Sequence, residues 1–434
     1  MAQRLSQEGY DGYAYAYPHK TAYRPLDPPV PLAEAWKTED KRRILLYVHL
    51  PFCEMRCGFC NLFTTVQPGV SLVDQTLAAI HRQSEIVARE IQAEGVAQAA
   101  FGGGTPSFLT ESQLEALFRK LDQDWPIPWD RIPISFEVSP GTVTASKLAL
   151  LRSRGVDRIS LGVQSFVPED LVALKRPQPK GELAMACELI RNAGFKVFNI
   201  DLIYGATGQD ATRWQSSLEQ ALAWRPEEIY LYPLYVGKLT HLDRSGRRPG
   251  DDRRERYRQA RDFLVGSGYR QISMRLFRRS EVRRDSEHCC QEDGMVGLGP
   301  GARSYTRGLH YSTEYAVGQG GVRLIIENFN QRTQADFAEA DYGAVLDQTE
   351  QKRRFVIKSL LRSEGVSPAS YRRLFGSYLD ADFPELGELS RMELAENDGH
   401  TWRLTSSGLE ASDTIGPWLY SPETEERMAA YQLT

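Results

Sequence analysis

The segment 47–63, YVHLPFCEMRCGFCNLF, carries three cysteines, Cys53, Cys57 and Cys60, in a C-x3-C-x2-C spacing. It overlaps the end of the apolar run 44–48 (ILLYV), which predicts a buried strand. In parallel α/β folds the chemistry gathers just past the strand ends. Thiolates this close together bind soft metal ions or form disulfides. The segment therefore predicts the chemical centre of the protein.

The number of cysteines narrows the choice of metal. A structural zinc ion takes four ligands, and this loop holds three cysteines with no further Cys or His. An iron–sulfur cluster held by three cysteines would leave one iron open for a substrate or cofactor. The alternatives to a cluster are a structural zinc site and cysteines that only pack in the protein core.

The spacing resembles the signature of the radical S-adenosylmethionine (SAM) superfamily. The wider stretch HLPFCEMRCGFCNLF is similar to the HemN/HemW-like branch, which includes oxygen-independent coproporphyrinogen dehydrogenase, the haem chaperone, and radical methylases and cyclopropanases. The resemblance implies a [4Fe–4S] cluster on Cys53, Cys57 and Cys60, with SAM on the fourth iron.

The composition of the 434 residues excludes several classes. A hydrophobic content of 41%, a charged content of 25% and a net charge of −4 describe an ordinary globular protein without the basic footprint of nucleic-acid binding. No apolar run approaches the roughly 20 residues that span a bilayer, and the N-terminus lacks the apolar core of a signal peptide. We expect a cytoplasmic protein with no membrane partner.

Alternating strand and helix patterns follow the cysteine loop. The expected strands are 44–48, 96–101, 132–138, 157–164, 196–203 and 227–235, with helices at 71–94, 110–122, 144–153, 180–193, 211–224 and 252–266. Such alternation implies parallel strands covered by helices. The expected fold class is α/β, a partial (β/α)6 radical SAM barrel with a C-terminal winged-helix-like α+β domain. The expected divisions are an arm at 1–43, the barrel and its extension at 44–320, and a lid over the barrel mouth at 321–434.

The arm is rich in Tyr and Pro, and its prolines rule out a long helix. Its aromatic side chains favour a structured arm packed over the barrel or its mouth. His19 and Lys20 could face a substrate, although a lone His more often has a structural role.

The run GGGTP follows the second expected strand and contains Gly103, Gly104 and Thr105. Glycines between strand and helix let backbone N–H groups approach a ligand closely, although a tight turn would need them too. In this position the run is similar to the family motif that grips the amino group of SAM.

Four polar residues sit at or just past ends of apolar strands: Glu137, Gln164, Arg176 and Asp201. Each one alone is compatible with a salt bridge or a cap. Together they form a predicted ligand site, because carboxylates suit an ammonium or ribose hydroxyls and a guanidinium suits a carboxylate. They also resemble the SAM-binding set of the branch, in which Tyr47 matches a tyrosine near the sulfonium.

A second SAM is implied by Phe59 and Gly103, which match residues at two SAM sites in coproporphyrinogen dehydrogenase. That enzyme carries a further cysteine just after the third, whereas this chain has Asn61. The departure favours transfer of a one-carbon unit (methyl or methylene) to an sp2 carbon of a small molecule. Porphyrinogen oxidation and haem chaperoning are the alternatives, and an external electron donor such as flavodoxin or ferredoxin is expected.

Further along the chain, Gly297, Gly299 and Gly301 imply close backbone approach. Cys289 and Cys290 are adjacent, so they are poor ligands for one tetrahedral ion. They are candidates for relaying a hydrogen atom or a methylene group near the substrate, with plain packing as the alternative.

Overall fold

The computed structural model describes residues 10, 12–250, 252–282 and 290–433. Its largest feature is a mixed sheet with the strand order β1-β15-β14-β13-β12-β2-β5-β6-β7-β8-β9-β11-β10. The central neighbours in this order run parallel. They are β12 (Met295–Leu298), β2 (Ile44–Leu50), β5 (Val96–Gly103), β6 (Ile134–Val138), β7 (Arg158–Gln164), β8 (Val197–Tyr204) and β9 (Glu228–Pro233). The parallel strands expected from the βα rhythm are therefore present.

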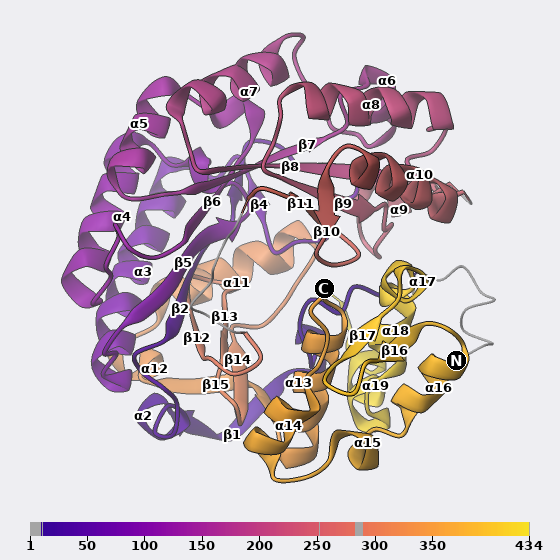
Figure 1. Cartoon of the computed structure of the whole chain (residues 1–434). Coiled ribbons are helices and arrows are strands. Elements are labelled where there is room, and N and C mark those ends of the chain that lie inside the picture. Colours follow the sequence, from indigo (N-terminus) through magenta and orange to yellow (C-terminus); the bar gives the residue numbers. More distant parts are fainter. Residues whose placement is uncertain (1–9, 11, 251, 283–289, 434) are drawn as a thin grey trace.

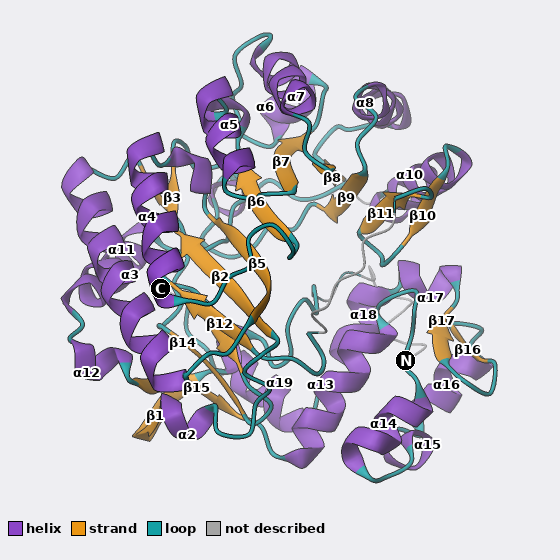
Figure 2. Ribbon diagram, turned by 60° about the vertical axis from the view of Figure 1, so that its left-hand side comes forward, coloured by secondary structure: helices purple, strands orange, loops and turns teal. Residues whose placement is uncertain are grey.

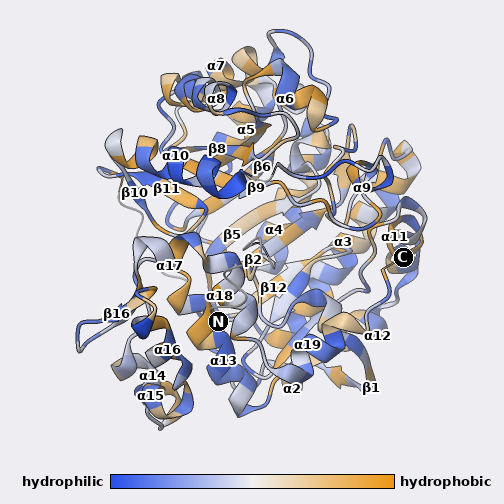
Figure 3. Cartoon of the chain, turned by 90° about the vertical axis from the view of Figure 1, so that its right-hand side faces the viewer, coloured by the Kyte–Doolittle hydropathy of each residue, from blue (hydrophilic) through white to orange (hydrophobic). Residues whose placement is uncertain are grey.

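Helices cover the outer face of these strands (Figure 1 and Figure 2). They are α3 (Val70–Ile91), α4 (Glu111–Asp124), α5 (Ala145–Ser153), α6 (Pro168–Ala173), α7 (Glu182–Ala193), α8 (Ala211–Ala223) and α10 (Arg253–Gly266). The short helix α9 (His241–Arg244) lies instead against the cysteine loop, where Leu242 N donates to Gly58 O at 2.9 Å. Leu77, Ile80, Val87 and Ile91 of α3 are buried at spacings that place them on one helix face. Side chains of the helices and strands share one apolar core. Figure 3 shows the contrast between the hydrophobic colour of β5 and the largely hydrophilic α10.

Antiparallel strands extend the parallel region on both sides. They are β13 (Arg303–Tyr305), β14 (Leu309–Ser312), β15 (Glu339–Val345) and β1 (Arg24–Pro31) on one side, and β11 (Leu276–Arg279) and β10 (Tyr269–Gln271) on the other. The N-terminal arm therefore contributes an edge strand, β1. This position suits its prolines, because proline has no backbone N–H and one side of an edge strand forms no hydrogen bonds within the sheet. The short helix α2 (Leu32–Ala35) follows it.

The glycines near β12 allow close backbone approach, as expected. A Cβ on Gly297 would lie 2.4 Å from Arg303 O, and one on Gly299 would lie 2.3 Å from His49 O. Gly299 also has a φ of +99°, which side-chain-bearing residues rarely adopt. These glycines let the end of β12 lie against the end of β2.

The C-terminal segment combines helices with one short antiparallel pair. The elements after β14, β15 excepted, are α11 (Gln319–Gln331), α12 (Gln334–Phe337), α13 (Gln348–Leu360), α14 (Pro368–Phe375), α15 (Leu379–Asp382), α16 (Glu385–Arg391), β16 (Ala395–Asn397), β17 (Trp402–Leu404), α17 (Ser406–Glu410), α18 (Ser412–Trp418) and α19 (Pro422–Ala429). The elements from α13 onward have an apolar core of their own, which includes Ala14 and Tyr17 of the arm, whereas α11 and α12 pack against α3. The winged-helix assignment and the three domain boundaries stay predictions.

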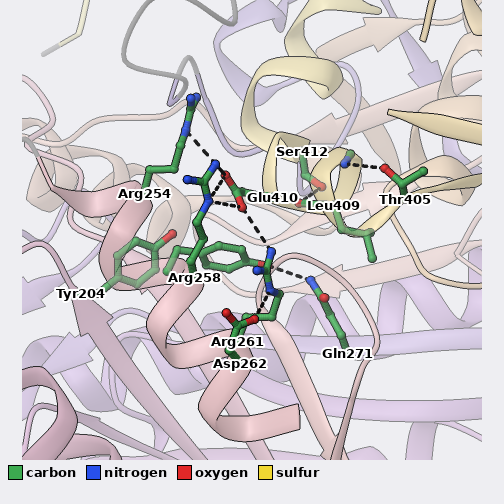
Figure 4. A network of polar contacts seen from close by, with 12 residues as sticks. Tyr204, Arg254, Arg258, Arg261, Asp262, Gln271, Thr405, Leu409, Glu410 and Ser412 are labelled. Carbon is green, nitrogen blue, oxygen red and sulfur yellow. Dashed lines mark hydrogen bonds and ion pairs between the residues drawn. The ribbon is translucent and has the colours of Figure 1, made fainter. Parts of the chain in front are cut away.

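Charged contacts join this segment to the barrel. Glu410 of α17 pairs with Arg258 and Arg261 of α10 at 2.8 and 3.2 Å (Figure 4). Arg275, just before β11, pairs with Asp413 of α18 at 2.8 Å, with both side chains almost fully buried. Among the described helices, none combines the length and the apolar composition that crossing a bilayer requires.

Candidate active site

The cysteine loop follows β2 at the carboxyl end of the parallel strands. A short parallel pair holds it, formed by β3 (Phe52–Cys53) and β4 (Thr65–Val66). Gly58 N donates to Leu174 O at 3.1 Å, and a Cβ on Gly58 would lie 2.5 Å from Lys175 Cβ. Only glycine therefore lets the middle of the loop pack against the turn after α6.

The three loop cysteines are free and half-buried. Among the described residues, no three His, Cys, Asp or Glu side chains converge closely enough to hold one metal ion. The sulfurs of a [4Fe–4S] site do not need to converge in this way, because each cysteine binds a different iron. Burial raises the pKa of Cys53 to about 12, a penalty that coordination to a metal removes. The donor set thus fits a polynuclear cluster.

Two neighbours are placed to stabilise sulfur in its thiolate form. Arg176 Nη1 donates to Cys57 Sγ at 2.8 Å, and Thr105 Oγ1 donates to Cys53 Sγ at 3.7 Å. Both residues were expected at a SAM site. The structure brings them to the cysteine loop itself, so the predicted cluster site and the predicted SAM site are adjacent.

The backbone N–H groups of the glycine run at the end of β5 are used within the protein. The N–H groups of Gly103, Gly104 and Thr105 donate to Glu137, Leu50 O and Phe52 O. These bonds hold the cysteine loop and β6, and the expected grip of the run on the amino group of SAM stays a prediction. The run is glycine because space is short: a Cβ on Gly104 would lie 2.9 Å from Cys53 Sγ.

Glu137 on β6 and Asp201 on β8 form a pair of like charges inside the barrel. Burial and the charge of Asp201 raise the pKa of Glu137 to about 7. Burial also raises the pKa of Asp201, although Arg158, Asn199 and Ser160 oppose the shift. Two carboxylates close enough for the charge of one to raise the pKa of the other form a site for a cation. SAM carries a sulfonium and an ammonium, so the pair fits it.

Gln164 and Arg176 complete this side of the site. Gln164 has a φ of +70° at an irregularity in β7, and its amide lies against Gly162. Arg176 Nη2 donates to Gly162 O at 2.8 Å, while its buried Nε has no hydrogen-bond partner. A guanidinium with one free donor beside the cysteine loop suits a ligand carboxylate such as that of the methionyl end of SAM.

Tyr47 lies between this carboxylate pair and the opposite wall. Its hydroxyl pairs with His49 Nδ1 at 3.1 Å, and His49 Nε2 lies 3.1 Å from Phe63 O. The carbonyl can only accept, so Nε2 carries the proton and Nδ1 accepts from Tyr47. Burial lowers the pKa of His49 to about 4, so this neutral tautomer persists near neutral pH. His49 was missed as a site residue, although it stands inside the quoted motif.

Solvent reaches part of this arrangement. Glu137 is exposed and Tyr13 of the arm is 38% exposed. Nevertheless, burial is the main influence on the pKa of both, so protein surrounds them. The arm thus approaches the barrel mouth, as expected from its aromatic content, and Tyr13 lies 3.6 Å from the Arg275 guanidinium, measured to the ring centroid.

The two candidates in the arm have different roles. Both ring nitrogens of His19 are used within the arm, by Tyr15 and Thr21, so His19 is structural. The Lys20 ammonium lies 3.5 Å from the ring centroid of Tyr315, whose hydroxyl donates to Asn61 O beside Cys60. Lys20 therefore faces the cluster side of the interior.

Phe59 and Cys290 are not at the centre of this arrangement. Phe59 packs against an apolar cluster that includes Leu234 and Leu242, and its contact with a second SAM stays a prediction. Cys290 Sγ donates to Gln291 Oε1 at 3.0 Å, and the backbone oxygen of Cys290 accepts from Arg354. Cys289 lies outside the described residues.

Arg303 was also missed. It lies on β13 with its side chain half-buried, and its guanidinium lies 4.6 Å from the ring centroid of Tyr15. The only sequence signal was an arginine in a short strand after the glycine run, which does not distinguish it from a surface residue.

Comparisons with known proteins agree with this geometry. The family model described as the radical SAM superfamily matches residues 47–219. The heme chaperone HemW of Mycobacterium tuberculosis is 31% identical over 303 residues, covering 66% of this chain and 77% of the relative. The oxygen-independent coproporphyrinogen III oxidase of Synechocystis is 28% identical over 393 residues, covering 86% of this chain and 82% of the relative.

A solved structure shares the fold. The coproporphyrinogen III oxidase HemN of Escherichia coli, a radical SAM enzyme, superposes with a TM-score of 0.78 at 23% sequence identity. The match covers 92% of this chain and 96% of that one.

Proposed function

Because the chain belongs to the HemN/HemW branch of the radical SAM superfamily, we propose that it cleaves SAM reductively and uses the resulting radical on a tetrapyrrole. The branch implies a [4Fe–4S] cluster and SAM. When bound, these supply a 5′-deoxyadenosyl radical. We further propose that an external flavodoxin or ferredoxin in a reducing, cytoplasmic compartment provides the electron.

The observation that carries the proposal is the like-charged pair Glu137 and Asp201 next to the cysteine loop. Their carboxylates would hold the cationic and hydroxyl groups of SAM, and Arg176 would hold its carboxylate. Cys53, Cys57 and Cys60 would hold the cluster. Tyr47 and His49 would keep the floor of the site in one arrangement, since their hydrogen bonds tie β2 to the end of the loop.

The relatives' names and the interior walls favour a tetrapyrrole. The relatives are named coproporphyrinogen III oxidase and heme chaperone, and those names refer to tetrapyrroles. Tyrosines line the interior of this chain, and the rings of Tyr230 and Tyr232 stack at 5.8 Å between centroids. Aromatic faces of this kind suit a flat conjugated macrocycle.

A second candidate is transfer of a one-carbon unit from a second SAM to an sp2 carbon. Asn61 favours it, because coproporphyrinogen dehydrogenase carries a further cysteine at this place. The named relatives are oxidases and haem chaperones rather than C1 transferases, so they favour the first candidate.

The test uses anaerobically reconstituted, reduced protein with methyl-labelled SAM and either coproporphyrinogen III or haem. We expect 5′-deoxyadenosine to form catalytically. Label in the tetrapyrrole together with S-adenosylhomocysteine would identify C1 transfer, whereas unlabelled oxidised product would identify oxidation. Stoichiometric haem binding without SAM cleavage would replace both with the chaperone role.

Cys57→Ala should lose cluster iron and the formation of 5′-deoxyadenosine. Cys187→Ala is the matched control, because Cys187 is fully buried in α7, away from the loop, and should keep both. Retention of SAM cleavage in Cys57→Ala would contradict the assignment of the cluster site.

A further inference from the structure

Positive charge gathers on one wall of the barrel, on the other side of β2 from Glu137 and Asp201 in the sheet order. It comes from Lys20 of the arm, Arg303 of β13, and Arg354 and Lys358 of α13. The Arg303 guanidinium lies 4.6 Å from the ring centroid of Tyr15, and the Tyr15 hydroxyl lies 3.2 Å from Nε2 of His19, the residue before Lys20. In keeping with this arrangement, the charge of Arg303 lowers the pKa of both Lys20 and Lys358. Within the described part of the chain, none of these four side chains pairs with a carboxylate.

Two of these cations are already used by the protein. Lys358 Nζ donates to Tyr15 O at 2.6 Å, and Arg354 donates to the backbone oxygens of Cys290 and Gln291. They therefore hold the arm and the start of the segment after residue 289. Their donors are not directed at a ligand.

The other two cations have donors to spare. Arg303 Nη1 is buried and has no hydrogen-bond partner. Apart from burial, the side chains that act most on the pKa of Arg303 are tyrosines, namely Tyr15, Tyr23, Tyr47 and Tyr305. Burial raises the pKa of Tyr23, Tyr47 and Tyr305, so these three stay neutral near pH 7 and do not balance the guanidinium.

Lys20 is the second cation with free donors. Its contact within the described residues is the ring of Tyr315, which offers a cation–π interaction but no carboxylate. Burial and the charge of Arg303 lower its pKa. The arm is fixed at this point, because His19 caps the turn Lys20–Ala22 and Tyr17 bonds Ser421.

Two half-buried cations that lack an anion among the described residues are costly, since each is partly desolvated and each repels the other. A carboxylate placed between them removes both penalties and can accept from Arg303 and Lys20 together. We propose that Lys20 and Arg303 form a subsite for a ligand carboxylate at the cluster side of the barrel mouth. The inference rests on the proposed function for the source of that carboxylate. It belongs either to a side chain of the tetrapyrrole or to a second SAM.

The first arm of the test compares protoporphyrin IX with its dimethyl ester, using fluorescence titration of the reconstituted full-length protein. The wild type should bind the ester about 10- to 100-fold more weakly, the usual worth of a charged hydrogen bond. The double variant Lys20→Met/Arg303→Met should bind acid and ester alike. Its iron content and melting temperature report whether the fold is kept.

The second arm counts SAM bound per protein by equilibrium dialysis. If the carboxylate is that of a second SAM, the wild type should bind two and the double variant one, while porphyrin binding is kept. Either the loss of ester discrimination or the loss of one SAM supports the subsite. If the double variant changes neither quantity, the proposal is wrong.

Lys358→Met is the matched control. It removes a cation from the same wall, but the ammonium of Lys358 already donates a hydrogen bond to Tyr15 O. It should keep both the discrimination against the ester and the SAM count. Equal loss in this variant would show a diffuse positive field and overturn the specific subsite. If the wild type binds neither porphyrin, the tetrapyrrole proposal fails, and the SAM count alone decides the subsite.

Discussion

The buried pair Arg275–Asp413 should be the strongest single ionic contact between the barrel and the C-terminal segment. The two side chains are 3% and 1% exposed, and Arg275 Nη2 donates to Asp413 Oδ2 at 2.8 Å. Tyr235 also donates its hydroxyl to Asp413. The substitution Asp413→Asn keeps the shape but leaves the Arg275 charge uncompensated.

The distance sets the size of the effect. Two unit charges 2.8 Å apart attract by about 6 kcal/mol at an effective dielectric constant of about 20. An asparagine oxygen still accepts one hydrogen bond, which returns about 1 kcal/mol. We therefore expect Asp413→Asn to lower the free energy of unfolding by about 3–5 kcal/mol, as for other broken buried pairs.

Urea unfolding followed by tryptophan fluorescence measures this change, because Trp402 and Trp418 belong to the C-terminal core. Glu327→Gln is the matched control. It breaks the ion pair with Arg323 on α11, whose side chains are 65% and 45% exposed, and should cost less than about 1 kcal/mol. Equal effects of the two substitutions would refute the argument that burial makes Asp413 important.

Two further predictions concern the active site. Burial and Asp201 raise the pKa of Glu137 to about 7, and cationic SAM binds its carboxylate form. SAM affinity measured by calorimetry should therefore rise up to about tenfold per pH unit below pH 7 and level off above it. Glu137→Gln should reduce this slope, and an unchanged slope would remove Glu137 from the SAM site. Gly104→Ala should lower iron content after reconstitution, since its Cβ would meet Cys53 Sγ at 2.9 Å. Gly266→Ala, in α10 with open space around it, should keep full iron and add about 0.5–1 kcal/mol of stability. Full iron in Gly104→Ala would contradict the tight fit of the glycine run.

Much of the fold was predictable because its signals are local. The alternation of apolar strands with amphipathic helices depends on periods of two and 3.6 residues, so β5 to β9 and their helices fell within a few residues of the expected ranges. The edge strand β1 was not predicted, because its pairing with β15 is a long-range contact and its prolines carry no strand signal.

The candidate site was predictable where a residue type alone implies chemistry. Cys53, Cys57 and Cys60 fall under this heading, and so do Glu137 and Asp201, since carboxylates in apolar strands need a reason to be there. His49 escaped notice because its role is to connect Tyr47 with Phe63 O, and neither contact is visible in one strand. The Gly103–Thr105 N–H groups were assigned to a ligand, although the folded chain bonds them itself.

Sequence by itself determined the βα order, the cysteine spacing and the membership of a family, because these depend on residues close together in the chain. Tertiary structure alone decided which charges are balanced. Arg303 and Lys20 lie far apart in the sequence, and only the fold brings both to one wall, where neither pairs with a carboxylate of the described residues. Electrostatic balance depends on distance and burial, and neither quantity can be read from a single segment of the chain.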